Sequence, residues 1–254
     1  MFKETLINQR FLNENEPYRI QDLRQSVMNV TAKEGISIGK APKGRTVSQE
    51  VCLEKKRKIL IYGDSNTYGY DPADFVEGRY PADVRWTSLL AKALKDDWEL
   101  IEEGLNGRRL PDLSHDEERV KGFLKGLSSE DLFAVMLGGN DILIVQDPDA
   151  AIPFRRMEEL LKFLKEQEEK PGILVIGPVP AGGEHLADPY WRKVYRECLK
   201  MNEGFGKLSR KYGQRFLDAA AWQVELCFDF VHFSENGHRR FAECMEKSLC
   251  SLVD

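Results

Sequence analysis

Three residue types that together can transfer an acyl group stand far apart in this sequence. Ser65 follows a run of apolar residues in KILIYGDSNTYG, and Asp229 and His232 lie three residues apart in DFVH. A serine hydroxyl is a weak nucleophile near neutral pH, so it needs a base within hydrogen-bond reach. An imidazole supplies that base, and a carboxylate on its other nitrogen fixes the tautomer. The pattern predicts a nucleophile at Ser65, a base at His232 and an orienting carboxylate at Asp229.

Acyl transfer also needs hydrogen-bond donors for the negative charge that develops on the carbonyl oxygen. We predict three such donors: the backbone N–H of Ser65, the backbone N–H of Gly107 in GLNGRR, and the side-chain amide of Asn140 in GGND. Glycine at position 107 lets the backbone approach a substrate without a Cβ atom in the way. Each short motif alone is more often a plain turn, so the prediction depends on their coming together.

Strand-like and helix-like segments alternate from residue 58 onward. Apolar runs of strand length are predicted strands, and stretches with apolar residues at helical spacing are predicted helices. The predicted strands are 58–63, 98–104, 131–139, 172–180 and 214–220, and the predicted helices are 86–97, 117–127, 152–170, 189–213 and 234–249. We expect Gly204 and Gly206 to bend or interrupt the fourth helix, and Ser234 to cap the last one.

Apolar strands that alternate with helices predict an α/β fold, with a parallel sheet covered by helices on both faces. In such sheets the functional crevice lies beyond the carboxyl ends of the strands. Ser65, Gly107 and Asn140 follow the first three predicted strands, and DFVH follows the fifth. We therefore expect these residues to meet at one edge of the sheet.

The composition limits the class of protein and its partners. Lys and Arg number 37 against 42 Asp and Glu, and this net charge of -5 argues against a nucleic-acid partner. No apolar run is long enough to cross a bilayer, and the first residues lack the apolar stretch of a signal peptide. Five cysteines without a C-x-x-C pair favour free thiols in a reducing compartment, so we expect a cytoplasmic protein. Neither H-x-x-x-H nor paired-cysteine spacing occurs, so no metal or cofactor is expected.

Residues 1–56 differ from the rest of the chain. They are polar, and four Gly and Pro residues cluster in EGISIGKAPKGR. The apolar pieces are too short to form a core of their own. We predict an N-terminal extension that packs on the domain or on a neighbouring subunit, or that is mobile. Packing on a neighbour is the basis for expecting a homo-oligomer.

These motifs resemble those of the SGNH (GDSL-type) serine hydrolases. The GDS tripeptide at 63–65 is similar to the block that carries the nucleophile, Gly107 lies in the second block and Asn140 in the third, and DFVH is similar to the last. The resemblance covers about residues 58–250. It is closest to the arylesterase/acyltransferase branch, through GDSNTYG, PADVRWTSLL and LIEEGL.

The resemblance implies a flavodoxin-like three-layer α/β/α sandwich with a five-stranded parallel sheet, within a hydrolase domain at 57–254. It implies metal-free hydrolysis of small esters through an acyl-enzyme, with acyl transfer to alcohols as a related activity. A narrower interpretation is O-deacetylation of carbohydrates. An interpretation from another class is a non-catalytic nucleotide- or phosphate-binding module, although no G-x-G-x-x-G or Walker-type loop follows the first strand.

Residues beside these motifs are predicted to contact a small-molecule ester. Aromatic rings are suited to the walls of a ligand pocket, an arginine to an anionic group, and a histidine in a glycine-containing loop to a cover over the site. The predicted substrate-contacting set is Asp64, Tyr70, Trp86, Arg108, Pro178 and His185. Packing, a turn or helix cap, or a solvated loop is the alternative for these residues.

Three further polar residues are expected to have no direct part in the chemistry. His115 and His238 lie in or near predicted helices, and we expect both on the surface. Asp141 directly follows a predicted oxyanion donor. We expect its carboxylate to hold the loop that presents Asn140.

Overall fold

A computed structural model describes residues 56–168 and 170–251 of the chain. The predicted N-terminal extension lies, apart from Lys56, outside these residues. The rest of the predicted hydrolase domain is described almost completely. No helix in the described ranges is both long enough and apolar enough to span a membrane.

All five predicted strands are present, and their helices alternate with them along the chain. The strands are β1 (Arg57–Gly63), β2 (Trp98–Gly104), β3 (Leu132–Met136), β4 (Gly172–Gly177) and β5 (Arg215–Asp218). The long helices are α3 (Trp86–Ala93), α4 (Leu113–Leu124), α6 (Ala151–Glu166), α7 (Pro189–Tyr212) and α8 (Glu235–Ser251). Three short helices were not predicted: α2 (Ser65–Tyr68), α5 (Gly139–Leu143) and the 3-10 helix η3 (Ala219–Trp222).

The strands form one parallel sheet in the order β2-β1-β3-β4-β5. This is the flavodoxin-like order, in which the chain reverses direction across the sheet between β1 and β3. Gly63 at the end of β1 lies opposite Gly104 of β2 and Met136 of β3. The three strands therefore end level, and the residues that follow them emerge side by side. The predicted fold class is confirmed.

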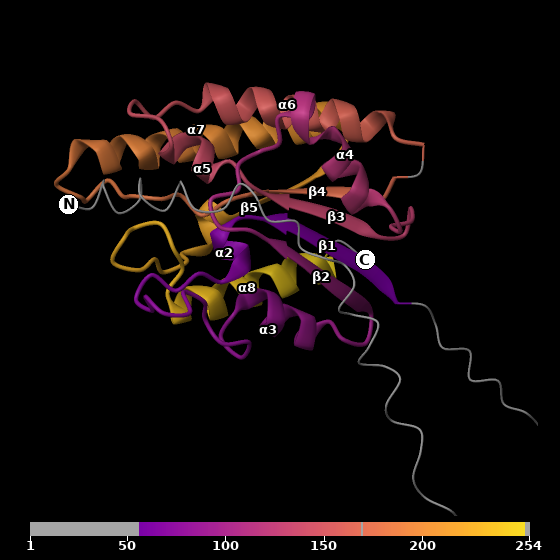
Figure 1. Cartoon of the computed structure of the whole chain (residues 1–254), viewed down its shortest axis with the longest axis horizontal. Coiled ribbons are helices and arrows are strands. Elements are labelled where there is room, and N and C mark those ends of the chain that lie inside the picture. Colours follow the sequence, from indigo (N-terminus) through magenta and orange to yellow (C-terminus); the bar gives the residue numbers. More distant parts are fainter. Residues whose placement is uncertain (1–55, 169, 252–254) are drawn as a thin grey trace, which may run out of the picture. The chain divides into compact units, whose positions relative to one another are not determined.

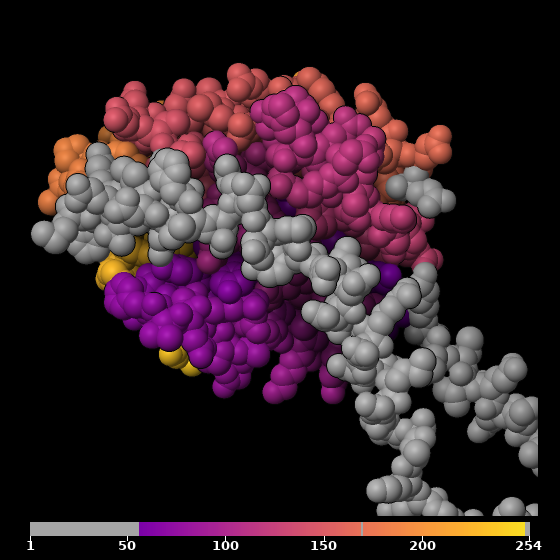
Figure 2. Space-filling view, viewed as in Figure 1, coloured from indigo at the N-terminus to yellow at the C-terminus, as the bar shows by residue number. Residues whose placement is uncertain are grey.

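Helices cover both faces of the sheet, because apolar side chains of β1 alternate between them. Leu60 and Tyr62 pack in the core shared with α4, α6 and α7. Ile59 and Ile61 pack in the core shared with α3 and α8. Figure 1 shows these two groups of helices on opposite sides of the sheet. In Figure 2 the α4 and α6 surface is magenta to pink at the top, and the surface around α3 is purple below.

Helix α7 runs without a break through Gly204 and Gly206, so the expected interruption is wrong. Both glycines serve close packing instead. A Cβ atom on Gly204 would lie 2.7 Å from the Phe154 ring, and one on Gly206 would lie 3.0 Å from the ring of Phe216. The missing side chains let α7 approach α6 and β5.

His238 is fully buried, which corrects the expectation that it lies on the surface. Its position in the first turns of α8 faces the start of α3, where its Nδ1 accepts a hydrogen bond from the Trp86 N–H at 3.3 Å. Burial, together with the nearby charges of Arg85 and His232, lowers the pKa of this imidazole to about 3. The predicted cap is present, because Ser234 Oγ accepts from the Gly237 N–H at 3.0 Å.

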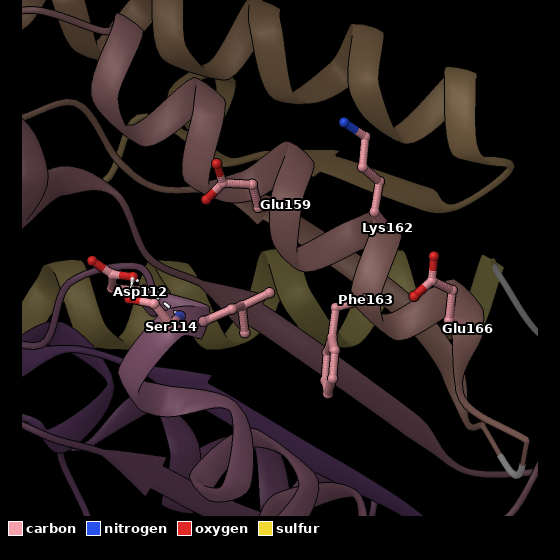
Figure 3. A pocket seen from close by; sticks show the side chains of 7 residues that line it. Asp112, Ser114, Glu159, Lys162, Phe163 and Glu166 are labelled. Carbon is pink, nitrogen blue, oxygen red and sulfur yellow. Dashed lines mark hydrogen bonds between the residues drawn. The ribbon is translucent and has the colours of Figure 1, made fainter.

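A surface groove lies between the start of α4 and the outer side of α6 (Figure 3). Its lining side chains are mixed in charge, and Asp112 Oδ1 accepts hydrogen bonds from the backbone and hydroxyl of Ser114. The lining residues are Asp112, Leu113, Ser114, Glu159, Lys162, Phe163 and Glu166. None of the predicted site residues is among them.

Gly104 lets the end of β2 closely approach the backbone of α2. A Cβ atom there would lie 2.3 Å from the Tyr68 nitrogen and 2.6 Å from its Cα. Since rigid backbone cannot yield cheaply, we expect Gly104→Ala to lower the free energy of unfolding by about 1–3 kcal/mol. Urea denaturation measures this change.

Gly122→Ala is the matched control, because it lies in α4 with no atom within 4 Å of an added Cβ. There the substitution should raise the free energy of unfolding by up to about 1 kcal/mol, since alanine favours helix. Equal effects of the two substitutions would contradict the close approach of β2 and α2.

Candidate active site

The nucleophile turn begins where β1 ends. Asp64 caps α2, its Oδ1 accepting from the Asn66 N–H at 3.0 Å, and Ser65 is the first residue of the helix. The turn is tight because a Cβ atom on Gly63 would lie 1.9 Å from Thr67 Oγ1. Glycine at position 63 therefore lets the helix fold back directly on the strand.

The structure brings Ser65, His232 and Asp229 into one hydrogen-bonded line. His232 Nε2 lies 3.0 Å from Ser65 Oγ, and His232 Nδ1 lies 2.6 Å from Asp229 Oδ2. A carboxylate can only accept, so Nδ1 carries the proton and Nε2 of the neutral ring accepts from the serine hydroxyl. This is the arrangement that a general base requires.

A tight loop after η3, rather than a helical turn, presents Asp229 and His232. The Cys227 N–H donates to the His232 carbonyl at 2.7 Å, and the Phe230 N–H donates to the Cys227 carbonyl at 3.0 Å. Phe230 has a φ of 60°, an uncommon conformation for a bulky residue. This bend lets Asp229 Oδ1 accept from the backbone N–H groups of Val231 and His232, each at 3.1 Å.

The environment favours the charged form of Asp229. Burial on its own raises the pKa of the carboxyl, but the hydrogen bonds and charge of His232 outweigh that effect, so the pKa is lowered overall. Tyr70 packs on the same imidazole, with ring centroids 4.6 Å apart. The His232 imidazole is therefore held by a carboxylate at Nδ1 and by an aromatic ring against it.

The predicted oxyanion donors follow three adjacent strands. Ser65 begins α2 after β1, Gly107 lies in the loop after β2, and Asn140 lies in α5 after β3. Gly107 has a φ of 71°, and this backbone conformation is by itself a reason for glycine at the position. Asn140 Nδ2 donates to the Arg108 carbonyl at 3.0 Å, so one of its two N–H groups ties α5 to the loop of Gly107.

Asp141 has the predicted structural place next to Asn140. Its buried carboxylate accepts from the Leu110 N–H at 2.9 Å and from Arg156 Nη1 at 2.8 Å. Burial raises the pKa of this carboxyl, and the Leu110 N–H and the Arg156 charge work in the opposite direction. No motif or spacing in the sequence pointed to Arg156, which lies on α6.

Arg108 is engaged by the protein itself rather than directed to an anionic substrate. Its Nη1 donates to the carbonyl oxygens of Gly63, at 3.0 Å, and Glu103. The guanidinium lies 4.6 Å from the centre of the Tyr62 ring. It thus joins the ends of β1 and β2, directly before the nucleophile turn.

Two other predicted substrate contacts are interior residues. Trp86 is fully buried, and its Nε1 donates to the Asn66 carbonyl at 2.9 Å, so it supports α2 instead of lining a channel. Pro178 is buried, and its carbonyl accepts from Asn202 Nδ2 at 2.9 Å. His185 is exposed in the loop after β4, and its contact with a substrate stays a prediction. Within the described ranges, no group of three or more His, Cys, Asp or Glu side chains could hold a metal.

The sequence profile of the GDSL-like lipase/acylhydrolase family matches residues 61–240, from β1 into α8. The chain belongs to this family. It is accordingly a carboxylic ester hydrolase, as the resemblance implied. No curated protein matches the chain at a significant level.

Several solved structures that are similar to the chain are named esterases. The carbohydrate acetylesterase Est24 from Sinorhizobium meliloti has 23% identity and a TM-score of 0.63, covering 78% of this chain and 100% of its own. The M. smegmatis aryl esterase has 24% identity and a TM-score of 0.61, covering 77% and 99%. A carbohydrate acetylesterase family member from Sinorhizobium meliloti has 25% identity and a TM-score of 0.63, covering 76% and 97%.

Asp64 is a buried carboxyl beside the serine, which fits a cap rather than the predicted substrate contact. It is 6% exposed. Burial raises its pKa to about 6, although the Asn66 N–H and the charges of His232 and Arg108 counteract the rise. The folded protein thus holds this proton more tightly than the unfolded chain, so ionisation of Asp64 costs stability as the pH rises from about 4 to above 6.

Asp64→Asn should therefore stabilise the fold in a pH-dependent way. Asparagine keeps the cap oxygen but removes the buried charge. We expect the gain in free energy of unfolding to increase by about 1–2 kcal/mol between pH 5 and pH 8. Urea denaturation at several pH values measures it, with the exposed Asp83→Asn as control. A gain that is independent of pH would refute the raised pKa.

Proposed function

We propose that this hydrolase cleaves small acyl esters by nucleophilic catalysis, with Ser65 as nucleophile, His232 as base and Asp229 as the orienting carboxylate. The observation that carries the proposal is the line of contacts at 3.0 Å and 2.6 Å through both nitrogens of the His232 ring. This geometry supplies what a serine hydroxyl lacks at neutral pH, namely a base already aimed at its proton.

The first half of the reaction forms an acyl-enzyme. Ser65 Oγ attacks the ester carbonyl while its proton passes to His232 Nε2. The oxyanion is held by the N–H groups of Ser65 and Gly107 and by the amide of Asn140. The imidazolium, stabilised by Asp229, gives the proton to the leaving alcohol as the C–O bond breaks. Water then attacks the acyl-enzyme, with His232 taking and returning a proton in the same way.

The same acyl-enzyme permits a second acceptor, because an alcohol can take the place of water in the last step. We therefore propose acyl transfer as a side reaction. Product analysis with an added primary alcohol would show the new ester, and hydrolysis alone across a range of alcohol concentrations would reject it.

Carbohydrate O-deacetylation is the second candidate function, because Est24 and a further similar structure are named carbohydrate acetylesterases. An acetylated sugar, an aryl acetate and esters of longer acyl chains would be compared by kcat/KM. A strong preference for the sugar favours deacetylation, and a preference set by the acyl chain favours a general esterase.

A fluorophosphonate probe separates the esterase from a non-catalytic binding module. Labelling at Ser65, located by mass spectrometry, supports the proposal. Absence of labelling together with tight nucleotide binding would support the module.

We further propose that the protein is cytoplasmic and forms a homo-oligomer. The free thiols of Cys198, Cys227, Cys244 and Cys250 support the cytoplasmic location. The composition of residues 1–56 supports the homo-oligomer.

Ser65→Ala should abolish turnover of p-nitrophenyl acetate. Removal of the nucleophile from a comparable triad lowers kcat by about 10⁶-fold, and we expect a loss of that order. Ser129→Ala, which changes an exposed serine before β3, should keep full activity and reports contamination and handling. Turnover by Ser65→Ala at the level of the control would falsify the assignment.

Asn140→Ala should cost less than loss of the nucleophile. Removing one oxyanion donor lowers kcat by roughly 10²–10³-fold. The measurement is kcat for p-nitrophenyl acetate, alongside a thermal unfolding curve to show that α5 is intact. A kcat within twofold of the unsubstituted protein would mean that Asn140 is only a structural residue.

A further inference from the structure

One side chain holds the backbone on both sides of the base. Asn66 Nδ2 donates to the Val231 carbonyl at 3.1 Å, and the Phe233 N–H donates to Asn66 Oδ1 at 2.9 Å. His232 is the residue between them. The amide of Asn66 therefore binds the segment Val231–Phe233 through a donor and an acceptor at once.

The backbone of Asn66 is itself held by hydrogen bonds, so its side-chain amide is attached to a fixed part of the chain. The Asn66 N–H donates to Asp64 Oδ1 at 3.0 Å, and the Asn66 carbonyl accepts from Trp86 Nε1 at 2.9 Å. Trp86 is fully buried against Phe241. Since Asn66 directly follows Ser65, the same anchored turn of α2 carries the nucleophile and grips the segment of the base.

The other bonds of the segment shape the loop without joining it to α2. The His232 carbonyl accepts from the Cys227 N–H at 2.7 Å, within the loop. Just before the segment, the Phe230 carbonyl accepts from the Gly182 N–H at 2.8 Å, which joins this loop to the loop after β4. The Phe233 carbonyl accepts from Cys227 Sγ at 3.4 Å, again within the loop. Besides the contact between Ser65 and His232, the amide of Asn66 is thus the hydrogen-bonding link from this segment to the nucleophile helix.

We propose that Asn66 is a positioning residue that sets the distance and angle between His232 Nε2 and Ser65 Oγ. The proposal rests on the proposed function, in which His232 takes the proton of Ser65. Asn66 acts on the chemical step through the base and leaves binding of the ester unchanged. Asparagine is suited to the place because its amide offers one donor and one acceptor at the same reach, whereas aspartate offers acceptors alone.

Asn66→Ala removes both bonds, and Asn66→Asp keeps the acceptor for the Phe233 N–H while placing an oxygen against the Val231 carbonyl. Because a misplacement of about 1 Å can cost roughly 10²-fold in rate, we expect Asn66→Ala to lower kcat for p-nitrophenyl acetate by about 10²-fold. Asn66→Asp should lower it by about 10-fold or more. KM should stay within threefold in both variants.

The matched control is Asn236→Ala. Asn236 Nδ2 donates to Glu225 Oε2 at 3.3 Å, so this substitution also removes an amide bond to the loop, but one that does not involve the residues on either side of His232. Its kcat should stay within twofold. All variants are compared at a temperature well below their unfolding midpoints, so that a loss of folded protein does not enter kcat.

The rate of fluorophosphonate labelling at Ser65 distinguishes failure of the positioning role from failure of the proposed function. Rapid labelling of the unsubstituted protein with slow labelling of Asn66→Ala supports the positioning role. Rapid labelling of both, or a loss of activity confined to KM, overturns it while the esterase assignment stands. No labelling of the unsubstituted protein overturns the proposed function itself. Should Asn66→Ala not fold, Asn66→Asp takes its place: slow labelling of Asn66→Asp supports the positioning role, and rapid labelling overturns it.

Discussion

The contact between His232 Nε2 and Ser65 Oγ joins residues that are 167 positions apart in the chain, and the chemistry of the site depends on it. Ser65 is held at the end of β1, an interior strand between β2 and β3, whereas the loop of His232 follows β5 at the edge of the sheet. That loop must cross the carboxyl edge of the sheet to reach the serine. Level strand ends make this crossing short, since every strand delivers its next residue to the same edge.

Polar groups taken out of water hold this edge in place, and each has partners that offset the cost of burial. Asp141 is bound by a backbone N–H and by Arg156, and Arg108 by two carbonyls and an aromatic ring. Such groups cost free energy when unpaired, so paired ones fix geometry rather than add much stability. Asp64 shows the remaining cost, because burial beside the serine raises its pKa to about 6.

Local patterns in the sequence were sufficient to predict the features of the structure that depend on neighbouring residues in the chain. Apolar runs predicted all five strands, and the order of motifs after those runs placed Ser65 and DFVH at one edge. The short helices α2 and α5 were missed, since four or five residues are too few for a periodic signal. His238 was wrongly expected on the surface, and Trp86 has the packing role that was the alternative to a substrate contact, because burial depends on which helices pack together and not on neighbours in the chain.

Residue type and position after a strand were enough to predict the family, the α/β fold and the candidates for nucleophile, base and carboxylate. Which polar side chains support them depends on how the elements pack together. Asn66, Arg108 and Arg156 act through partners distant in the chain or on other elements, and hydrogen bonds are made only at distances and angles that packing alone sets.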